Sequence, residues 1–242
     1  MQGIKKLQKL IDENDHIVFF GGAGVSTESG IPDFRSVDGL YNQQFDYPPE
    51  TILSHSFFMR HTEEFYRFYQ TKMLYSGIVP NAAHKKLAEL EAAEKLSAVI
   101  TQNIDGLHQL AGSKNVLELH GSMLRNHCTI CDKAYAIDAM YGPGVPRCDC
   151  GGVIKPDVVL YEEALDGDTV ERAVCELRTA GMVIVGGTSL AVYPAAGLLN
   201  SVCGKIVLIN RDATRLDSAA ELVLCAPIGE VLSQIQVRPS LR

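Results

Sequence analysis

Residues 16–27 read HIVFFGGAGVST, an apolar run that passes directly into a glycine-rich turn. Glycines in such a turn let the backbone approach a pyrophosphate, and the N-terminus of a following helix favours its negative charge. Thr27 occupies the third glycine position of the dehydrogenase fingerprint, and residues 40–44 do not read as the strand end that would carry its acidic residue. The stretch therefore predicts a dinucleotide-binding α/β fold without the features of hydride transfer.

Short apolar runs and helical patterns alternate along the rest of the chain. The runs are rich in Val and Ile, as expected for strands buried on both faces, and they lie at His16–Phe20, Ala98–Thr101, Val116–Leu119, Met182–Val185, Ile206–Ile209 and Glu221–Leu224. The helical patterns are Asn81–Lys95, with Asn81 as its cap, Asp168–Thr179 and Ile228–Ile235. This alternation predicts a Rossmann-like, mostly parallel sheet with helices on both faces.

Two stretches break the alternation and predict a smaller lobe inserted into the nucleotide-binding core. One is rich in aromatic residues, which we expect to form a core stripe, with the lining of a substrate groove as the alternative. The other holds four of the seven cysteines. We expect a single domain over residues 1–242, with its core at about 1–30, 80–121 and 156–242 and its small lobe at about 31–79 and 122–155.

Composition narrows the classes of partner. The net charge is −7 and the pI is near 5.5, whereas phosphate-backbone binding needs a basic face. No apolar run approaches the ~20 residues that would span a bilayer, and Met1–Asp15 is polar and amphipathic rather than a signal peptide. We therefore expect a cytoplasmic protein with no direct nucleic-acid partner and no membrane partner. The sequence itself does not specify the oligomeric state, for which we expect a monomer.

The cysteine spacing predicts a metal site. Cys128-x-x-Cys131 is followed, after 16 residues, by Cys148-x-Cys150. Two close thiolate pairs on separate turns can complete a tetrahedral zinc shell, and four protein ligands leave no open position for a substrate. The zinc is therefore expected to be structural. We expect the remaining cysteines to be small buried residues, because their surroundings are apolar; they are Cys175, Cys203 and Cys225.

Polar blocks follow several of the predicted strands. Arg35 can bind a phosphate bidentately, and Phe34 can shield a reactive centre from water. The block 101–108 (TQNIDGLH) begins where a predicted strand ends, the edge at which ligands bind in open parallel sheets. Its amide and carboxylate groups suit ribose hydroxyls and a carboxamide. His120 also ends a predicted strand and is a candidate general base, with a purely structural histidine as the alternative.

Taken together, these blocks resemble the sirtuin family of NAD-dependent protein-lysine deacetylases, in its bacterial form. The matching blocks occur in the family's order over roughly residues 15–228, and they are residues 22–35, 101–108, 119–121, the four cysteines, 187–190 and Asn210. The resemblance implies NAD as co-substrate, a structural Zn²⁺ and acetylated proteins or peptides as substrates.

The resemblance also implies roles for individual residues. The positions that hold the pyrophosphate and cover the nicotinamide ribose are matched by Ala23, Thr27, Phe34 and Arg35. The pocket for nicotinamide and its ribose is matched by Gln102, Asn103, Ile104 and Asp105. The adenosine side is matched by Thr188, Ser189, Asn210 and Ile228. His120 matches the catalytic base, with Asn103 and Asp105 assisting the chemistry.

The peptide side follows the same resemblance. The extended segment on which the acyl-lysine peptide lies as an added strand is matched by Val158, Val159, Leu160 and Tyr161, and the facing loop by Val192 and Tyr193. Tyr161-Glu162-Glu163 departs from the Phe-Gly-Glu common in the family. Relatives that favour acidic acyl groups carry Tyr and, three residues later, Arg in the corresponding helix; our alignment places Phe68 and Thr71 there and predicts a preference for neutral acyl groups.

The implied reaction consumes NAD. The acetyl-lysine oxygen attacks the ribose carbon that carries nicotinamide, and His120 then deprotonates a ribose hydroxyl that attacks the resulting imidate. Water completes the reaction to lysine, nicotinamide and O-acetyl-ADP-ribose. Two alternatives remain: a protein ADP-ribosyltransferase that uses the same NAD cleavage, and a zinc-ribbon binding module with a decayed nucleotide core. His120 favours deacetylation over simple transfer, and the intact polar blocks and acidic charge count against the binding module.

Overall fold

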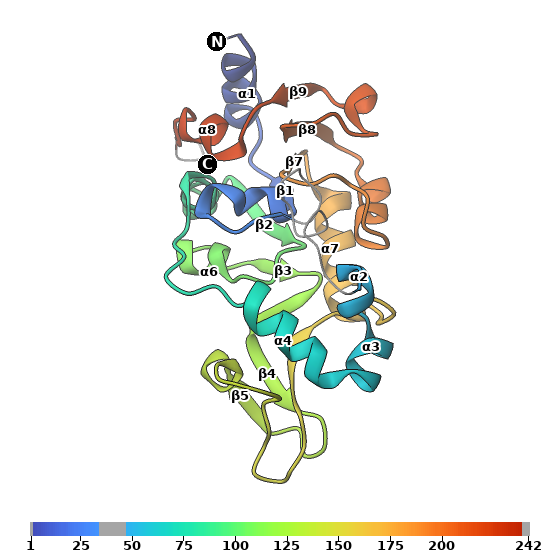
Figure 1. The fold of residues 1–242 in the computed structure, drawn as a ribbon. Helices are drawn as coiled ribbons and strands as arrows, with labels where there is room; N and C mark the ends of the chain where they lie inside the picture. Colours follow the sequence, from blue (N-terminus) through green and yellow to red (C-terminus); the bar gives the residue numbers. More distant parts are fainter. Residues whose placement is uncertain (1, 34–46, 239–242) are drawn as a thin grey trace.

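The computed structural model describes residues 2–33 and 47–238. A six-stranded parallel sheet in the order β3-β2-β1-β7-β8-β9 forms the larger lobe (Figure 1). Its strands are β1 (Ile17–Gly21), β2 (Leu96–Thr101), β3 (Val116–Glu118), β7 (Met182–Gly186), β8 (Lys205–Asn210) and β9 (Leu222–Cys225). All six predicted strands are present, and their ends differ by one or two residues because the ladder hydrogen bonds, and not hydropathy, decide where a strand stops.

Alternate strand residues point to opposite faces of the sheet, so continuous apolar strands build two cores. Phe19 and Ile184 pack on one face, under helices α1 (Gln2–Asp12), α5 (Ala82–Ala92) and α8 (Ile228–Ser233). Phe20 and Val185 pack on the other face, under α7 (Gly167–Thr179) and the 3₁₀ helix η5 (Ala195–Ser201). The doubly covered, Rossmann-like sheet predicted from the sequence is therefore confirmed.

A local signal sets the beginning of α5 as expected. Asn81 caps α5 by accepting from the backbone N–H groups of Ala83 and His84, and the His84 side chain returns a contact to the Asn81 backbone. The glycine turn differs from expectation. It continues into two 3₁₀ helices, η1 (Ala23–Val25) and η2 (Thr27–Ser29), and not into an α-helix. The chain turns again at Gly30, which has a φ of +91° and ends η2.

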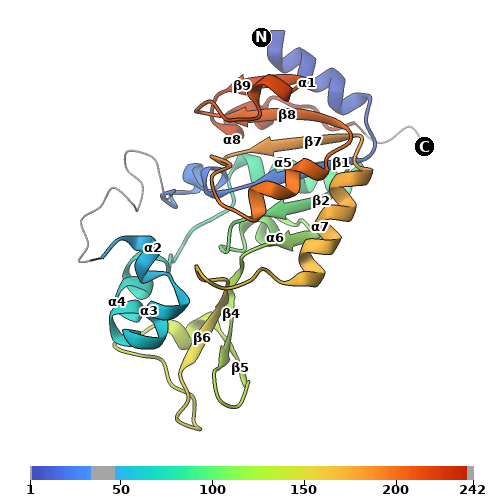
Figure 2. The same cartoon turned by 90° about the vertical axis from the view of Figure 1, so that its right-hand side faces the viewer.

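The small lobe combines helices and strands that are distant in sequence (Figure 2). Its elements are α2 (Pro49–Ile52), α3 (His55–Arg60), α4 (Thr62–Lys72), β4 (Gly121–Cys128), β5 (Ala134–Ala136), η4 (Ile137–Met140) and β6 (Ile154–Val158). The strands pair antiparallel in the order β5-β4-β6. The aromatic run spans two helices, and its rings form the lobe's core: Phe57, Phe58, Phe65, Tyr66, Phe68 and Tyr69 are all buried.

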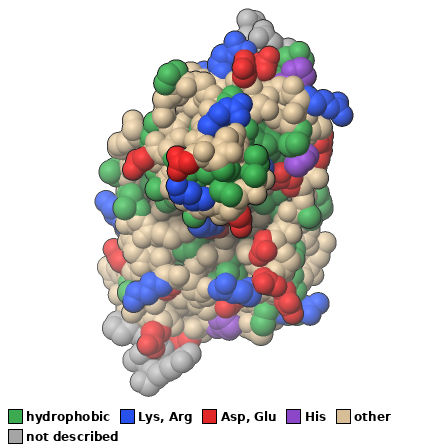
Figure 3. All heavy atoms as spheres, turned by 90° about the horizontal axis from the view of Figure 1, so that it is seen from below, with side chains coloured by type: hydrophobic (Ala, Val, Ile, Leu, Met, Phe, Trp, Pro, Cys, Tyr) green, Lys and Arg blue, Asp and Glu red, His purple; other side chains and the backbone are tan. Residues whose placement is uncertain are grey.

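The remaining elements are α6 (Leu107–Ala111) and η6 (Asp217–Ala219). No helix among the described residues is both long and apolar enough to cross a membrane. The face seen from below, which carries the small lobe, mixes hydrophobic, basic and acidic side chains, and the described side chains form no continuous patch of one charge on it (Figure 3). The expected lack of a nucleic-acid partner and the expected monomeric state stay predictions.

Candidate functional site

A cavity of about 440 Å³ lies where the strand order of the parallel sheet reverses, between β1 and β7. The loops that follow β1, β2, β7 and β8 open into it, as expected for ligand sites at the carboxyl edge of such a sheet. The cavity brings together the predicted pocket residues that the structure describes: Ala23, Thr27, Gln102, Asn103, Ile104, Asp105, His120, Val158, Val159, Leu160, Tyr161, Thr188, Ser189, Val192, Tyr193, Asn210 and Ile228. Phe34 and Arg35 lie outside the described residues.

The glycine turn after β1 packs directly on the turn after β7. Gly24 donates its backbone N–H to the Gly187 carbonyl at 2.8 Å. A Cβ on Gly24 would lie 2.9 Å from the Gly187 Cα, closer than non-bonded carbon atoms approach. Glycine is therefore required for the two turns to touch, and their contact forms one wall of the cavity.

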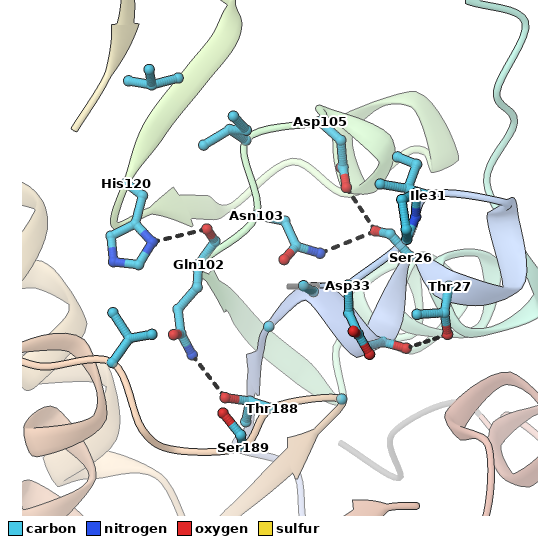
Figure 4. A pocket seen from close by; sticks show the side chains of 18 of the residues that line it. Ser26, Thr27, Ile31, Asp33, Gln102, Asn103, Asp105, His120, Thr188 and Ser189 are labelled. Atoms are coloured by element: carbon cyan, nitrogen blue, oxygen red, sulfur yellow. Dashed lines mark hydrogen bonds between the residues drawn. The ribbon is translucent and has the colours of Figure 1, made fainter. Parts of the chain in front are cut away.

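A hydrogen-bonded cluster links the glycine turn to the block after β2 (Figure 4). Ser26, which is 1% exposed, donates through Oγ to Asp105 Oδ2 at 2.6 Å and accepts from Asn103 Nδ2 at 3.0 Å. The Leu107 backbone N–H donates to the other Asp105 oxygen at 2.9 Å. Burial raises the pKa of Asp105, while the bonds from Ser26 and Leu107 act in the opposite direction. The cluster therefore holds an amide and a carboxyl group in defined orientations beside the cavity.

His120 is positioned by the first residue after β2. Its Nδ1 lies 3.0 Å from the Gln102 carbonyl oxygen (Figure 4). A carbonyl can only accept, so Nδ1 carries the proton and Nε2 keeps its lone pair. Burial lowers the pKa of His120, and the bond to Gln102 opposes this shift. The ring is thus neutral at pH 7, with an unprotonated nitrogen available as a general base.

Thr188 and Asn210 form the opposite side of the cavity. Asn210 accepts from the Thr188 backbone N–H at 3.0 Å and donates to the Thr188 carbonyl at 2.7 Å, so its amide is held at both ends. Thr188 Oγ1 accepts from the Gln102 side chain at 3.1 Å. Because Thr188 follows β7, Asn210 ends β8 and Gln102 follows β2, these bonds join three strands at the ligand edge of the sheet.

The residues predicted to lie on the peptide side also reach the cavity. Val159 donates its backbone N–H to the His120 carbonyl at 3.0 Å, which fixes the extended segment 158–161 beside that histidine. At the other end of the segment, Tyr161 pairs with the small lobe, because its N–H donates to the Leu53 carbonyl at 3.0 Å. Tyr193, in the facing loop, is 60% exposed. An open strip of backbone and side chain therefore lines the cavity mouth.

The four predicted zinc ligands converge at the end of β4. The Sγ atoms of Cys128, Cys131, Cys148 and Cys150 all lie within 4.8 Å of one another. Cys128 Sγ lies 3.4 Å from Cys150 Sγ, and Cys131 Sγ lies 3.6 Å from Cys148 Sγ. Four sulfurs at the Zn–S distance of ~2.3 Å would be about 3.8 Å apart, so the cluster fits zinc with little adjustment. No cysteine is among the described residues that line the cavity, so the cluster is a separate site.

Three sequence expectations need correction or extension. Cys175, Cys203 and Cys225 are exposed and not buried. Local hydropathy does not show whether a residue lies on the outer face or at the end of a helix or strand, and so it does not predict this exposure. Phe68 and Thr71 do not line the cavity. Tyr69 in α4 and Met73 just after its end do line it, and they are four residues apart on the same face. The aromatic run therefore supplies both a core and, through Tyr69, a cavity wall.

Sequence reasoning also missed some lining residues. They include Ser26, Glu28, Asp33, Met123, Glu162, Glu163, Arg211 and Asp212. Ser26 lay inside the quoted glycine stretch, so its polar side chain was a usable signal. Glu28 had no local signal, because it accepts from the Gly229 backbone N–H at 2.6 Å across 201 positions of sequence.

Known proteins resemble this chain over almost its whole length. A model of the Sir2 family matches residues 22–194. The NAD-dependent protein deacetylase of Clostridium acetobutylicum is 54% identical over 238 residues, covering 96% of this chain and 97% of that protein. The NAD-dependent protein deacetylase of Cutibacterium acnes is 52% identical over 236 residues, covering 96% and 97%.

Solved structures agree with this. A Sir2 variant bound to a deacetylated p53 peptide and 3'-O-acetyl ADP-ribose has a TM-score of 0.88 at 38% identity, covering 95% of both chains. A Sir2 homologue in complex with NAD has a TM-score of 0.85 at 40% identity, covering 95% of this chain and 91% of the other. The family model, the bacterial relatives and the shared fold lead to one conclusion: the chain belongs to the Sir2 family.

Proposed function

We propose that this chain is an NAD-dependent protein-lysine deacetylase, which converts acetyl-lysine, NAD and water into lysine, nicotinamide and O-acetyl-ADP-ribose. The observation that carries the proposal is the cavity itself. Around one space lie a neutral histidine, a buried amide–carboxyl cluster and the extended 158–161 segment, which together support the proposal.

Two sets of polar side chains suit the two ends of NAD. Thr188 and Asn210, with Ser189 beside them, present hydroxyl and amide groups to the adenosine side. Asn103 and Asp105 present an amide and a carboxyl group to the nicotinamide ribose and carboxamide. Ala23 and Thr27 lie on the glycine turn between these two sets, where backbone N–H groups favour a pyrophosphate. NAD would therefore lie across the ligand edge of the sheet.

His120 would act as the base for the second half of the reaction. Its Nδ1–H is held by Gln102, so the orientation of the ring and the position of the Nε2 lone pair are fixed before substrate binds. A base with a lowered pKa stays unprotonated near neutral pH, which suits removal of a proton from a ribose hydroxyl. Asp105 would act earlier, by holding the nicotinamide group before it leaves.

The acetylated peptide would lie between the 158–161 segment and Val192–Tyr193, which face each other across the mouth of the cavity. Its acetyl-lysine would pass inward between apolar side chains such as Leu160 and Met123. These side chains limit the access of water to the reacting carbon. The adjacent cysteine cluster would hold zinc, which supplies folding free energy to the small lobe and takes no part in the chemistry.

The test separates the two halves of the reaction. His120→Ala should lower deacetylation about 10²–10⁴-fold, the usual contribution of a positioned general base. Exchange of labelled nicotinamide into NAD, which needs acetyl-peptide but not the base, should be reduced much less. Asp105→Asn is the matched variant, and it should lower exchange itself.

Thermal melts of both variants check that the fold is intact. A His120→Ala protein that melts like wild type and deacetylates normally would remove His120 from the mechanism. Release of nicotinamide with ADP-ribose attached to protein, and without deacetylated peptide, would instead identify an ADP-ribosyltransferase.

A further inference from the structure

The turn at residues 160–163 has an unusual backbone at Glu162. Its φ is +76°, in the left-handed region that residues with a side chain rarely adopt. The pattern common in the family places glycine at this position, which adopts that conformation without steric cost. Glu162 also lines the cavity and directly follows the 158–161 peptide strip. A strained residue at this place calls for compensating contacts, and the structure contains them.

The Glu162 carboxylate binds the beginning of α3. One oxygen accepts from the Ser56 backbone N–H at 2.9 Å, and the other accepts from Ser56 Oγ at 3.0 Å. Ser56 lies in the first turn of that helix, whose backbone N–H groups have no partners within the helix. The carboxylate therefore uses both of its oxygens to join the 160–163 turn to α3.

Neighbouring bonds reinforce the same junction. The Tyr161 N–H donates to the Leu53 carbonyl at 3.0 Å, and the His55 N–H donates to the Tyr161 carbonyl at 2.9 Å. Glu163 Oε1 lies 2.9 Å from His55 Nδ1, and Glu163 Oε2 accepts from the Leu160 N–H at 2.9 Å. Glu163 matches the glutamate common in the family, whereas Glu162 adds a second carboxylate to the junction.

The opposite end of the peptide strip is bonded to the residue proposed as the base. Val159 donates to the His120 carbonyl, and Val158 pairs with Gly121 in the β4–β6 ladder. The strip thus connects His120 at one end to α3 at the other. The His120 end is held by backbone hydrogen bonds, whereas the α3 end is also held by the side-chain bonds of Glu162.

From these contacts we infer that Glu162 is a positioning residue that holds the peptide strip in its binding conformation before the acetyl-peptide arrives. The inference rests on the proposed deacetylase function and adds a determinant of peptide affinity to it. Glu162 acts through the turn and touches neither the reacting carbon nor His120. Loosening the turn adds conformations that must be lost when peptide binds, so it should raise KM for peptide and leave the chemical step intact.

The test compares three variants of the full chain in steady-state deacetylation. Glu162→Gly removes the carboxylate and also relieves the left-handed strain, so it should not lower the melting temperature substantially. Glu162→Gln keeps one acceptor oxygen and should restore part of the affinity. Glu94→Gly is the matched control, because Glu94 also has a positive φ, +57°, and an exposed side chain but does not line the cavity.

We expect Glu162→Gly to raise KM for an acetyl-peptide at least five-fold, with KM for NAD and saturated kcat within two-fold of wild type. Glu162→Gln should fall between the two, and Glu94→Gly should match wild type. An unchanged peptide KM in Glu162→Gly, or an equal change in Glu94→Gly, would overturn the inference. The proposed function would still stand if the wild type is active. A fall in kcat and in melting temperature without a change in peptide KM would also overturn it, since that pattern marks a structural role. Absence of NAD-dependent deacetylation in the wild type would instead reject the proposed function.

Discussion

Two buried histidines make the stability of this fold depend on pH. His84 and His108 are 0% and 1% exposed, and their ring centroids lie 4.7 Å apart. Among the described residues, both ring nitrogens of His108 and the Nε2 of His84 have no hydrogen-bond partner. Burial lowers the pKa of His84 to about 4 and that of His108 to about 3, and the charge of His84 adds to the shift of His108.

The sign follows from comparing the folded and unfolded chains. An unfolded histidine takes up its proton near pH 6.5, whereas the folded rings stay neutral until pH 4 or below. The two rings therefore do not change the free energy of unfolding at pH 7.5. They lower it progressively as the pH falls from about 6.5 to about 4. At pH 5, 1.5 pH units below the unfolded pKa, each ring costs about 2 kcal/mol, or about 4 kcal/mol together. This is a large share of the roughly 5–15 kcal/mol by which a typical domain is stable.

The assay is urea unfolding of wild type and His108→Phe at pH 7.5 and pH 5.0. Phenylalanine is an apolar ring of similar size, and His108 already lies 6.0 Å, centroid to centroid, from Phe19. The free energy of unfolding lost between the two pH values should be about 2 kcal/mol smaller in His108→Phe than in wild type. The control is the difference between the two proteins at pH 7.5, where the buried rings are neutral, because it measures the effect of the substitution on packing alone. Equal losses in wild type and His108→Phe would show that the buried pair does not resist protonation, and the reasoning would fail.

Two further predictions concern the metal and the acyl group. Each chain should contain one zinc ion. Cys131→Ser should lower the melting temperature by about 10 °C or more, because metal binding supplies folding free energy. An elemental analysis that finds no zinc, together with activity that survives strong chelation, would contradict this. Acetyl-peptide should be turned over about 10²-fold better in kcat/KM than the matched succinyl-peptide, since Tyr69 and Met73 provide no cation and burying an unpaired carboxylate costs several kcal/mol. Comparable kcat/KM values for the two peptides would show that another group binds the carboxylate.

Local patterns predicted the features that short-range physics controls. Asn81 was recognisable as a helix cap because capping involves residues only two or three positions away. The apolar runs predicted the strands of the sheet because a strand buried on both faces must be apolar throughout. The paired cysteines predicted their own convergence, since a CxxC turn holds two thiolates close together.

Other features were beyond local patterns. Tyr69, and not Phe68 or Thr71, faces the cavity because the rotation of α4 is set by packing against the rest of the small lobe. The exposure of Cys175, Cys203 and Cys225 depends on which neighbours cover each one, and an apolar sequence around a residue does not specify them. Glu28 and Gly229 meet only because the chain closes back on itself.

The sequence by itself determined the sheet, the order of the polar blocks and the four zinc ligands, because each depends on residue type and on spacing along a few turns of chain. The tertiary structure decided which atoms meet. It placed the proton of His120 on Nδ1 by setting a carbonyl beside it, joined Ser26 to Asp105, and used Glu162 to bind the peptide strip to α3. These contacts join residues 18 to 106 positions apart. Two of them lie within the larger lobe and the third joins the two lobes, so only the folded chain brings such positions within hydrogen-bond distance.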